Sequence, residues 1–326
     1  MTPRSRLHRL LAAAAALAGC GHAAAQGQAI VSSEKDHALA VVDLKTQAVT
    51  GTIPTCKRPR HLQLTPDGKQ LVVACGDSGQ ADFIDLASRK SVKRVALGED
   101  PEIFDLARDG KTLYVSNEED GELGVVDLGS GKRTASIKVG GEPEGVKLSA
   151  DGKTVYVTSE VANVVQAVDL ASGKVAATVK TGKRPRRFAL TPDGRELWVT
   201  NELDASVTII DTQAMKAVHT LRFEVKGARA ADITPVGLTM TRDGKRAFVG
   251  LGRANHVAFV DVAARKVTDL VLVGKRAWGL GLDKAEKTLV VANGLSDDVT
   301  IVDVAGAKAL KSVPVGRVPH SVVVVE

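Results

Sequence analysis

Short runs of hydrophobic residues recur along the chain from residue 28 to its end, and polar turn residues separate them. In one representative stretch the runs cover residues 102–107, 112–117, 123–128 and 133–139. Each run is rich in Val, Ile and Leu and is bounded by Gly, Asp, Asn or Pro, which favours β-strands over helices. The pattern therefore predicts an all-β fold built from short strands.

The runs repeat with a fixed period. An aspartate ends one run in every copy: Asp43, Asp85, Asp127, Asp169, Asp211, Asp261 and Asp303. Successive aspartates are 42 residues apart, except for one step of 50. A loop proline keeps the same spacing, with alanine in its place once: Pro59, Pro101, Pro143, Pro185, Pro235, Ala277 and Pro319. A period near forty with four short strands per copy is the signature of a β-propeller.

Seven copies of four antiparallel strands predict a seven-bladed β-propeller, because packing the blades around an axis covers the sheet faces that one blade leaves exposed. Residues 28–33, 38–44 and 48–54 supply the second to fourth strands of one copy, and residues 320–325 supply a first strand. We therefore expect the N- and C-terminal strands to share a blade and close the ring. The propeller domain is predicted to cover residues 26–326.

The segment before the propeller has a different composition. Residues 1–25 begin with a basic stretch, continue with an apolar run at residues 10–18, and end in small residues, which predicts a signal peptide. The four residues ending at Cys20 also resemble a lipobox. Two outcomes stay open: cleavage after Ala25, or lipidation of Cys20 and a lipid anchor. Both predict a periplasmic location.

The charge of the chain gives little support for a nucleic-acid partner. Residues 1–25 hold three arginines and no acidic residue, so without them the formal charge falls from +6 to +3. Aromatic residues make up 3% of the chain, too few for a platform that stacks single-stranded bases. No later apolar run reaches the roughly eighteen residues that a membrane helix needs. We expect neither nucleic-acid binding nor a transmembrane segment.

Two cysteines remain in the propeller domain. Cys56 and Cys75 lie 19 residues apart in the first full repeat. Two alternatives fit this pair: a disulfide, as is common in exported proteins, or two buried free thiols.

Residues present in every copy are expected to serve the fold. The seven aspartates are predicted to accept hydrogen bonds in the turn after each third strand. The segment Gly76-Asp77-Ser78-Gly79 resembles a serine-protease nucleophile loop but lacks the partners of a triad. The chain contains no Cys-x-x-Cys-His motif, and its histidines lack metal-ligand spacing. We predict no catalytic residue, metal or cofactor, with a joint metal or haem contact of His61 and His320 as an alternative.

Functional candidates are the positions at which the copies differ. The residue after each loop proline, where the inner strand enters the axial channel, is in chain order Arg60, Glu102, Glu144, Arg186, Val236, Trp278 and His320. Basic residues in the adjoining loops extend this ring: Arg58, Arg184, Arg276 and Arg317. Two interpretations stay open. One is a solvated rim of mixed charge, and the other is a docking or small-molecule site whose basic side favours anions.

The single step of 50 residues places an eight-residue insertion at about residues 223–234. It carries Arg229 on the same face as the ring. We expect a flap or a partner-binding loop, because loops on a rigid scaffold carry specificity. An insertion tolerated without a role is the alternative.

Several motifs resemble a known family. The strands Tyr114-Val115-Ser116-Asn117 and Trp198-Val199-Thr200-Asn201 resemble the YVTN-type β-propeller repeat, across residues 28–326. The fifth unit, with Ile233-Thr234-Pro235-Val236-Gly237 and Gly252-Arg253-Ala254-Asn255, resembles propellers associated with PQQ-dependent catabolism. This resemblance implies a periplasmic protein encoded beside quinoprotein alcohol oxidation and transport functions. Its implied partners are a periplasmic quinoprotein dehydrogenase or a transport component, and it supplies no catalytic residues.

These observations together predict a non-catalytic accessory propeller of PQQ-dependent alcohol catabolism. It would bind a protein partner or a small polar ligand at the channel mouth. One alternative is an enzyme of the lactonase type, which would use Glu102, Glu144 or His320 as a base. Another is a redox propeller that binds PQQ or haem.

Overall fold

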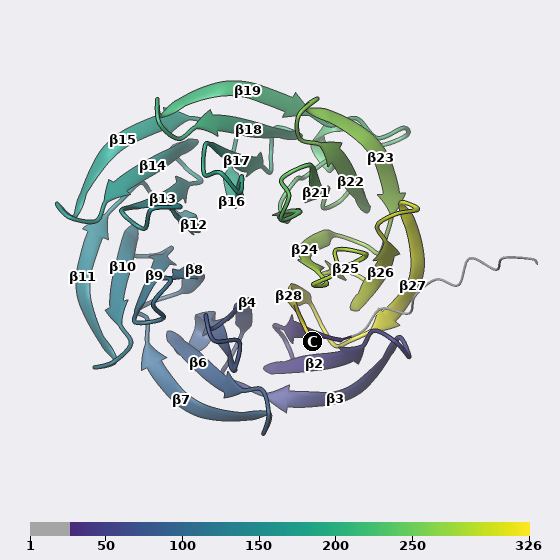
Figure 1. Ribbon diagram of the computed structural model, residues 1–326, viewed down its shortest axis with the longest axis horizontal. Helices are drawn as coiled ribbons and strands as arrows, with labels where there is room; N and C mark the ends of the chain where they lie inside the picture. Colours follow the sequence, from purple (N-terminus) through teal and green to yellow (C-terminus); the bar gives the residue numbers. More distant parts are fainter. Residues whose placement is uncertain (1–26) are drawn as a thin grey trace, which may run out of the picture.

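The computed structural model describes residues 27–326, which form seven four-stranded antiparallel sheets arranged in a ring (Figure 1). The predicted signal peptide and Cys20 lie outside these residues. In each full blade the first strand lies nearest the axis and the last lies on the outside (Figure 1). No helix among residues 27–326 is long and apolar enough to span a membrane.

The strands of the blades are as follows. Blade 1 contains β4 (Pro59–Leu64), β5 (Gln70–Cys75), β6 (Gln80–Asp85) and β7 (Lys90–Ala96), and blade 2 contains β8 (Pro101–Leu106), β9 (Thr112–Asn117), β10 (Glu122–Asp127) and β11 (Lys132–Lys138). Blade 3 contains β12 (Pro143–Leu148), β13 (Thr154–Ser159), β14 (Val164–Asp169) and β15 (Lys174–Lys180), and blade 4 contains β16 (Pro185–Leu190), β17 (Glu196–Asn201), β18 (Ser206–Asp211) and β19 (Lys216–Arg222). Blade 5 contains β20 (Leu238–Met240), β21 (Arg246–Gly250), β22 (His256–Asp261) and β23 (Lys266–Leu272), and blade 6 contains β24 (Ala277–Leu282), β25 (Thr288–Asn293), β26 (Asp298–Asp303) and β27 (Lys308–Pro314).

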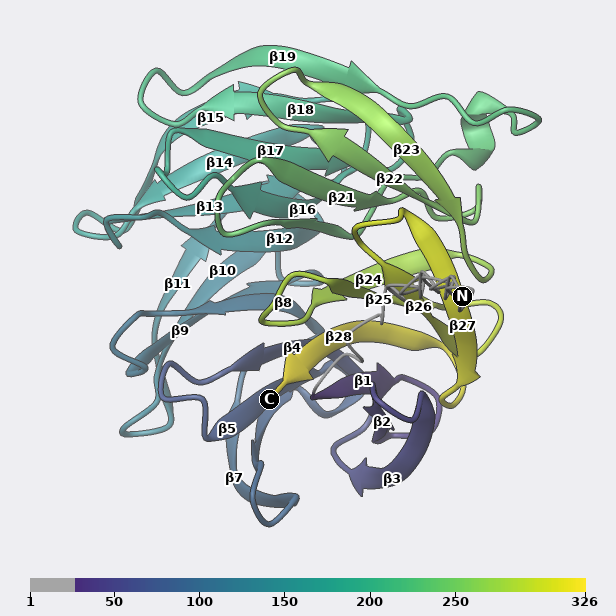
Figure 2. The ribbon, with the colours of Figure 1, turned by 45° about the vertical axis from the view of Figure 1, so that its right-hand side comes forward.

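The closing blade joins both ends of the chain. It contains β1 (Gln28–Ser33), β2 (Ala38–Asp43), β3 (Ala48–Pro54) and β28 (Pro319–Val325), in the spatial order β28-β1-β2-β3. β28 pairs antiparallel with β1, so that Val322 lies opposite Val31 (Figure 2). The predicted ring closure by the terminal strands is confirmed.

Apolar side chains on both faces of each sheet form the core. On β5, Val72 packs with residues of blade 2 such as Phe104, whereas Leu71 and Val73 pack with residues of the closing blade such as Leu39. This follows from the alternation of side chains along a strand. Each middle strand is therefore hydrophobic at nearly every position, as the sequence pattern indicated.

The repeated aspartates stabilise turns, as predicted. Asp43 accepts a hydrogen bond from the backbone N–H of Thr46, three residues later, at 2.6 Å. The aspartates of all six other blades accept the equivalent bond. Because every blade uses its aspartate in this way, these carboxylates belong to the fold.

A β-bulge in the inner strand brings two consecutive side chains toward the axis. In blade 1, Pro59 lies opposite Cys75 and Leu62 lies opposite Val73, so the inner strand holds one extra residue. The same shift occurs in blades 2, 3, 4 and 6, and β1 and β28 have an irregular register as well. Bulges commonly redirect side chains beside functional sites.

Hydroxyl groups on second strands fix this bulge in four places. Ser116 accepts a hydrogen bond from the backbone N–H of Ile103 and donates one to the carbonyl of Glu144 in the next blade, at 3.2 and 2.6 Å. Ser32 has the same role between β28 and the carbonyl of Arg60, at 3.0 and 2.8 Å. Thr158 and Thr200 make equivalent contacts. The backbone of the predicted ring is therefore held between adjacent blades.

Candidate functional site in the axial channel

The channel contains two cavities on either side of the ring. The outer cavity has a volume of about 230 Å³, and the inner one has about 290 Å³. The outer cavity is lined by Glu34, Arg60, Glu118, Glu144, Arg184, Arg186, Arg276, Trp278, Val318 and His320. Apolar side chains such as Phe104 and Phe188 line much of the inner cavity. Trp278 and His320 line both cavities and therefore lie at the boundary between them.

The polar ring residues are buried and paired with opposite charges. Glu102 and Glu144 are each 1% exposed, and Arg186 is 5% exposed. Arg60 forms an ion pair with Glu102 of the next blade. Arg186 and Arg187 both approach Oε1 of Glu144, at 3.3 and 3.2 Å. The interpretation of this ring as a solvated rim is wrong for these residues, because their charges lie inside the channel.

The two ring carboxyls have opposite protonation preferences. Burial and the charge of Glu144 raise the pKa of Glu102 well above its usual value. Burial alone would also raise the pKa of Glu144, but the charges of Arg186, Arg187 and Arg60 outweigh it and lower the pKa to about 2. A hydrogen bond from Glu102 contributes to this lowering. The raised pKa of Glu102 favours its protonated form and the lowered pKa of Glu144 favours its ionised form, so Glu102 is the easier of the two to protonate.

His320 is neutral and has a defined tautomer. Its Nε2 atom lies 3.2 Å from Nη2 of Arg187, and its Nδ1 atom lies 3.0 Å from Oγ of Ser321. Because a guanidinium can only donate, Nε2 accepts the bond from Arg187 and Nδ1 carries the proton. Burial and the charge of Arg60 lower the pKa of His320 well below its usual value. His61, on the wall of the inner cavity, has its pKa lowered to about 3 by burial and by Arg187.

Trp278 is stacked with arginine side chains. The guanidinium carbon of Arg276 lies 3.9 Å from the centre of its ring, and that of Arg186 lies at 5.3 Å. Such contacts are favourable cation–π interactions. The indole is 6% exposed, and its Nε1 atom is buried without a hydrogen-bond partner among residues 27–326.

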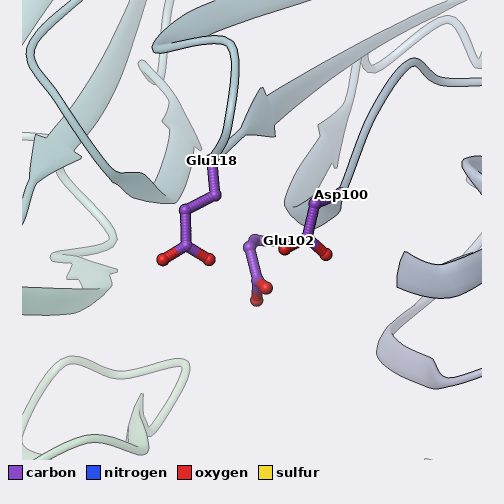
Figure 3. Close-up of side chains that lie close together, drawn as sticks. All are labelled: Asp100, Glu102 and Glu118. Atoms are coloured by element: carbon purple, nitrogen blue, oxygen red, sulfur yellow. The ribbon is translucent and has the colours of Figure 1, made fainter.

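Acidic residues form two groups beside the ring. Asp100, Glu102 and Glu118 offer oxygens within 4.8 Å of one another (Figure 3), and so do Glu118, Glu142 and Glu160. Each group has the donor type that a divalent cation accepts. However, Asp100 pairs with Arg58 and Glu160 pairs with both Arg184 and Arg186. Asp100, Glu102 and Glu160 therefore already have cationic partners, whereas Glu118 and Glu142 form no ion pair among residues 27–326.

Several predicted residues do not reach the channel. Arg317 is bound to Asp36 on the surface at 2.6 Å, and Arg229 is bound to Asp232 at 2.6 Å, with side chains 67% and 83% exposed. Arg58 contacts Asp100, Asp77 and Glu102 at the rim but does not line either cavity.

The insertion is anchored to the body of the propeller. Phe223, Val225 and Ile233 are buried in the apolar cluster between blades 4 and 5, and Ala230–Asp232 form the short 3-10 helix η2. No residue of 223–234 lines either channel cavity. The insertion therefore does not cover the channel as a flap in this structure, and partner binding by it stays a prediction.

Two channel residues lay outside the predicted ring. Arg187 contacts both Glu144 and His320, and Glu160 pairs with Arg186. Arg187 follows Arg186 directly, and only the β-bulge brings both side chains to the axis. Glu160 follows the second strand β13 and reaches the ring from the neighbouring blade. No residue pattern in the sequence indicates the bulge, so apart from its charge nothing in the sequence identified Arg187 as a channel residue.

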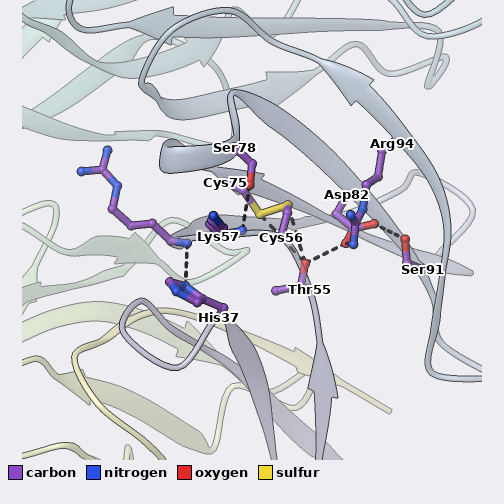
Figure 4. The surroundings of a disulfide bond; sticks show 10 residues. His37, Thr55, Cys56, Lys57, Cys75, Ser78, Asp82, Ser91 and Arg94 are labelled. Atoms are coloured by element: carbon purple, nitrogen blue, oxygen red, sulfur yellow. Dashed lines mark hydrogen bonds and ion pairs between the residues drawn. A yellow bond between two sulfur atoms is a disulfide. The ribbon is translucent and has the colours of Figure 1, made fainter.

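A disulfide lies beside the loop that leads to Arg60. Cys56 and Cys75 are joined, which corresponds to the first of the two alternatives for this pair (Figure 4). In the same loop the backbone N–H of Lys57 donates to Oγ of Ser78, and that of Arg58 donates to Nδ1 of His37, at 2.9 and 3.1 Å. Ser78 lies in the short helix η1 (Gly76–Ser78), and its hydroxyl accepts a backbone hydrogen bond from Lys57. This agrees with the expectation that Ser78 lacks the partners of a catalytic triad.

Comparison with known proteins supports a propeller family and corrects the functional prediction. Residues 166–325 match the family described as "Lactonase, 7-bladed beta-propeller". No curated protein matches the sequence significantly. The YVTN-type and PQQ-associated subfamilies receive no support from these comparisons, and the coarser assignment to a seven-bladed β-propeller stands.

Solved structures share the fold. The periplasmic gluconolactonase of Pseudomonas aeruginosa superposes with a TM-score of 0.79 at 20% identity, over 92% of this chain and 99% of that one. Hydrazine synthase of Kuenenia stuttgartiensis gives a TM-score of 0.75 at 24% identity, over 85% and 92% of the two chains. A dihydro-heme d1 dehydrogenase gives 0.68 at 16% identity, over 91% and 75%.

The prediction of a non-catalytic accessory role in PQQ-dependent catabolism is wrong. The match of residues 166–325 to a lactonase family favours the lactonase alternative instead. The residues of the predicted ring carry opposed charges. The structure pairs those charges inside the channel, where they set the protonation of a buried carboxyl pair.

Proposed function

We propose that the protein is a hydrolase of the lactonase type that opens a cyclic ester in the outer cavity. The observation that carries this proposal is the position of Glu144, which lines the cavity beside Arg186 and has its pKa lowered to about 2 by the surrounding arginines. The match of residues 166–325 to a lactonase family supports the same reaction class.

Glu144 is the catalytic base of this proposal. It removes a proton from a water molecule, whose oxygen then bonds to the lactone carbonyl carbon. The tetrahedral intermediate collapses by breaking the bond to the ring oxygen, and Glu144 returns its proton to that oxygen. The product is a hydroxy acid, and the base is regenerated.

The arginines stabilise the charge that develops on the carbonyl oxygen. Arg186 and Arg187 supply N–H donors that are already fixed beside Glu144, so little reorganisation is needed during the reaction. When the substrate oxygen engages these donors, Glu144 loses part of the interaction that holds its pKa near 2. Its basicity therefore rises as the substrate binds.

Glu102 acts as a positioning residue. As a protonated acid it donates a hydrogen bond to Glu144 and orients its carboxylate. A carboxylic acid kept neutral by its surroundings can act as such a donor. Ionisation of Glu102 would place two negative charges side by side in the channel.

We further propose that the protein works in the periplasm. The signal-like composition of residues 1–25 supports export, and the Cys56–Cys75 disulfide supports an oxidising compartment. Secretion of the full chain can be measured by fractionation and by mass spectrometry of its N-terminus. An unprocessed chain confined to the cytoplasm would contradict this assignment.

Hydrolysis of a small panel of lactones by the full-length processed protein tests the proposed reaction. The panel is D-glucono-1,5-lactone, D-galactono-1,4-lactone and D-glucaro-1,4-lactone, and acid release is followed at constant pH against buffer alone. Glu144→Gln should lower kcat about 10²- to 10⁴-fold, the usual range for loss of a general base. Glu119→Gln is the matched control because Glu119 is exposed on the neighbouring blade. Full activity of Glu144→Gln would refute the role of this base, and inactivity of the wild type toward the whole panel would refute the hydrolase.

A second candidate is a redox cofactor site in the inner cavity. His61 and His320 line this cavity, and burial lowers the pKa of both, which leaves neutral imidazoles of the kind that ligate metals. The dehydrogenase of dihydro-heme d1 among the fold neighbours favours the same idea. Titration with haemin should then give an absorbance change that is lost in His61→Gln. An unchanged spectrum would remove this candidate.

A further inference from the structure

The arginines of the channel differ in whether an acidic residue neutralises them. Arg60, Arg186 and Arg187 each lie within 4 Å of a glutamate carboxylate, and so does Arg184. Arg276 lines the outer cavity but has no ion pair among residues 27–326. Its backbone N–H is bound to Asn255, while its guanidinium lies flat against Trp278. The cavity therefore contains one cation that the protein leaves unbalanced.

Trp278 has an unmet hydrogen-bond donor in the same place. Its side chain lines the outer cavity, and its Nε1 atom is buried without a partner among the described residues. Buried indole N–H groups usually have an acceptor, because leaving one unpaired costs free energy. Burial lowers the pKa of Arg276, while the charges of Glu202 and Glu34 act in the opposite direction without outweighing it.

We infer that Arg276 and Trp278 form a carboxylate subsite, so that the preferred substrate is a lactone that carries a second, free carboxylate. This inference rests on the proposed lactonase function for its reaction, while the subsite rests on its own contacts. The guanidinium supplies a planar pair of donors that matches a carboxylate, and its contact with the indole ring holds it in place. Both lie in the same cavity as Glu144, so one ligand can reach the subsite and the base together.

The charges of the cavity favour a single negative charge over two. Arg276 is the one unpaired arginine of the cavity among residues 27–326, whereas Glu34, Glu118 and Glu144 line the same space. A carboxylate balances one guanidinium. A phosphate monoester carries up to two charges at neutral pH and would meet repulsion from these acids. The subsite therefore fits a carboxylate better than a phosphate.

A matched pair of lactones tests the subsite. D-glucaro-1,4-lactone carries a carboxylate where D-glucono-1,4-lactone carries a hydroxymethyl group, and the two share a five-membered ring with the same configuration. For the wild type we expect a higher kcat/KM with the carboxylate. Arg276→Gln should lower the ratio of the two kcat/KM values about tenfold or more, as expected for loss of a charged hydrogen bond. Arg317→Gln is the control, because it removes the same charge from an exposed position bound to Asp36.

Binding of D-glucarate, measured by calorimetry, separates the subsite from the reaction. Wild-type protein should bind D-glucarate, and both Arg276→Gln and Trp278→Phe should weaken that binding, by about tenfold for the arginine variant. If D-glucarate binds in this way but no lactone is hydrolysed, the lactonase proposal fails and the subsite stands. If both lactones are hydrolysed equally and Arg276→Gln changes neither the ratio nor D-glucarate binding, the subsite is refuted and the hydrolase stands. Tighter, Arg276-dependent binding of glucose 6-phosphate would overturn the choice of carboxylate.

Discussion

Glu102 and Glu144 occupy equivalent positions on adjacent inner strands, yet their pKa values are shifted in opposite directions. Both are almost fully buried, so burial alone would raise both values. The difference comes from the arginines: Glu102 has Arg60 close by, whereas Glu144 is contacted by Arg186 and Arg187. The different number of nearby arginines therefore makes Glu102 easier to protonate than Glu144.

The same substitution should therefore have opposite effects at these two positions. Glu144→Gln should lower the free energy of unfolding at pH 8 by about 3–5 kcal/mol, because it leaves the buried Arg187 without a carboxylate and removes one of the carboxylates that contact Arg186. Glu102→Gln should leave that free energy unchanged or raise it, since an amide still donates to Glu144 and cannot ionise. Urea unfolding of both variants at several pH values measures this.

The pH dependence provides the control for this pair. The pKa of Glu144 is depressed, so its stabilisation is complete above about pH 4.5 and disappears as the pH falls toward about 2. The pKa of Glu102 is raised, so the wild type loses stability as the pH rises above about 4.5, and Glu102→Gln should not. Equal destabilisation by both variants at pH 8 would contradict the assigned proton distribution.

Ser32 offers a test of how the ring is held in place. Its hydroxyl donates to the carbonyl of Arg60 and accepts the N–H of Ser321, so it links the closing blade to blade 1. Ser32→Ala should lower the free energy of unfolding by about 1–3 kcal/mol, because it leaves buried polar groups unpaired. Chemical denaturation measures this. The matched control is Ser33→Ala, which removes a neighbouring hydroxyl that makes one longer bond of 3.3 Å; an equal loss in both variants would contradict the special role of Ser32.

The fold could be predicted from the sequence because each of its determinants is repeated. The aspartates that end the third strands bond their turns in all seven blades, and this repetition made the period visible. The ring closure followed from the same period, since β28 supplies the inner strand that the N-terminal segment lacks.

The site could be predicted only in part, because its determinants are not repeated. The position after each loop proline correctly led to Arg60, Glu144, Arg186, Trp278 and His320 as channel residues. Arg229 and Arg317 lie outside the channel, where nearby aspartates bind them at the surface, and their binding role stays a prediction. The position of Arg187 in the channel depends on the β-bulge, which the sequence does not reveal. The raised pKa of Glu102 depends on its burial and on charged residues from several blades, which only the folded structure brings together.

The buried histidine at the boundary of the two cavities should make the protein sensitive to acid. The pKa of His320 is lowered in the folded state. Below about pH 6.5 the unfolded chain therefore binds a proton at this residue, whereas the folded protein does not. Stability should therefore decrease as the pH falls below about 6.5, by up to about 1.4 kcal/mol per pH unit for this group. Thermal unfolding between pH 7 and 5 measures this for the wild type and for His320→Gln.

The expected outcome is a smaller acid-dependent loss in His320→Gln than in the wild type. His219 is exposed on the outer strand β19, so His219→Gln serves as the control and should retain the wild-type slope. Identical slopes in the wild type and His320→Gln would show that this imidazole is not held neutral by the fold.

The disulfide connects global stability to the geometry of the site. Cys56 and Cys75 enclose a loop with a sequence separation of 19, and that loop contains Arg58 and Arg60. A cross-link of this span lowers the conformational entropy of the unfolded chain and thereby raises the free energy of unfolding by about 3 kcal/mol. The double variant Cys56→Ala, Cys75→Ala should lose about that much free energy of unfolding in urea. Because both cysteines are buried, a thiol reductant should act on the wild type mainly when it is partly unfolded.

Reductant therefore supplies the internal control for this prediction. Adding dithiothreitol during urea unfolding should shift the wild type toward the double variant and leave the double variant unchanged. The loop carrying Arg60 would then be held by hydrogen bonds, such as those that Lys57 and Arg58 donate, without the covalent link. Looser placement of Arg60 should weaken its ion pair with Glu102 and reduce lactone turnover in the double variant before unfolding begins. If dithiothreitol leaves the unfolding midpoint of the wild type unchanged, the Cys56–Cys75 disulfide does not form in solution.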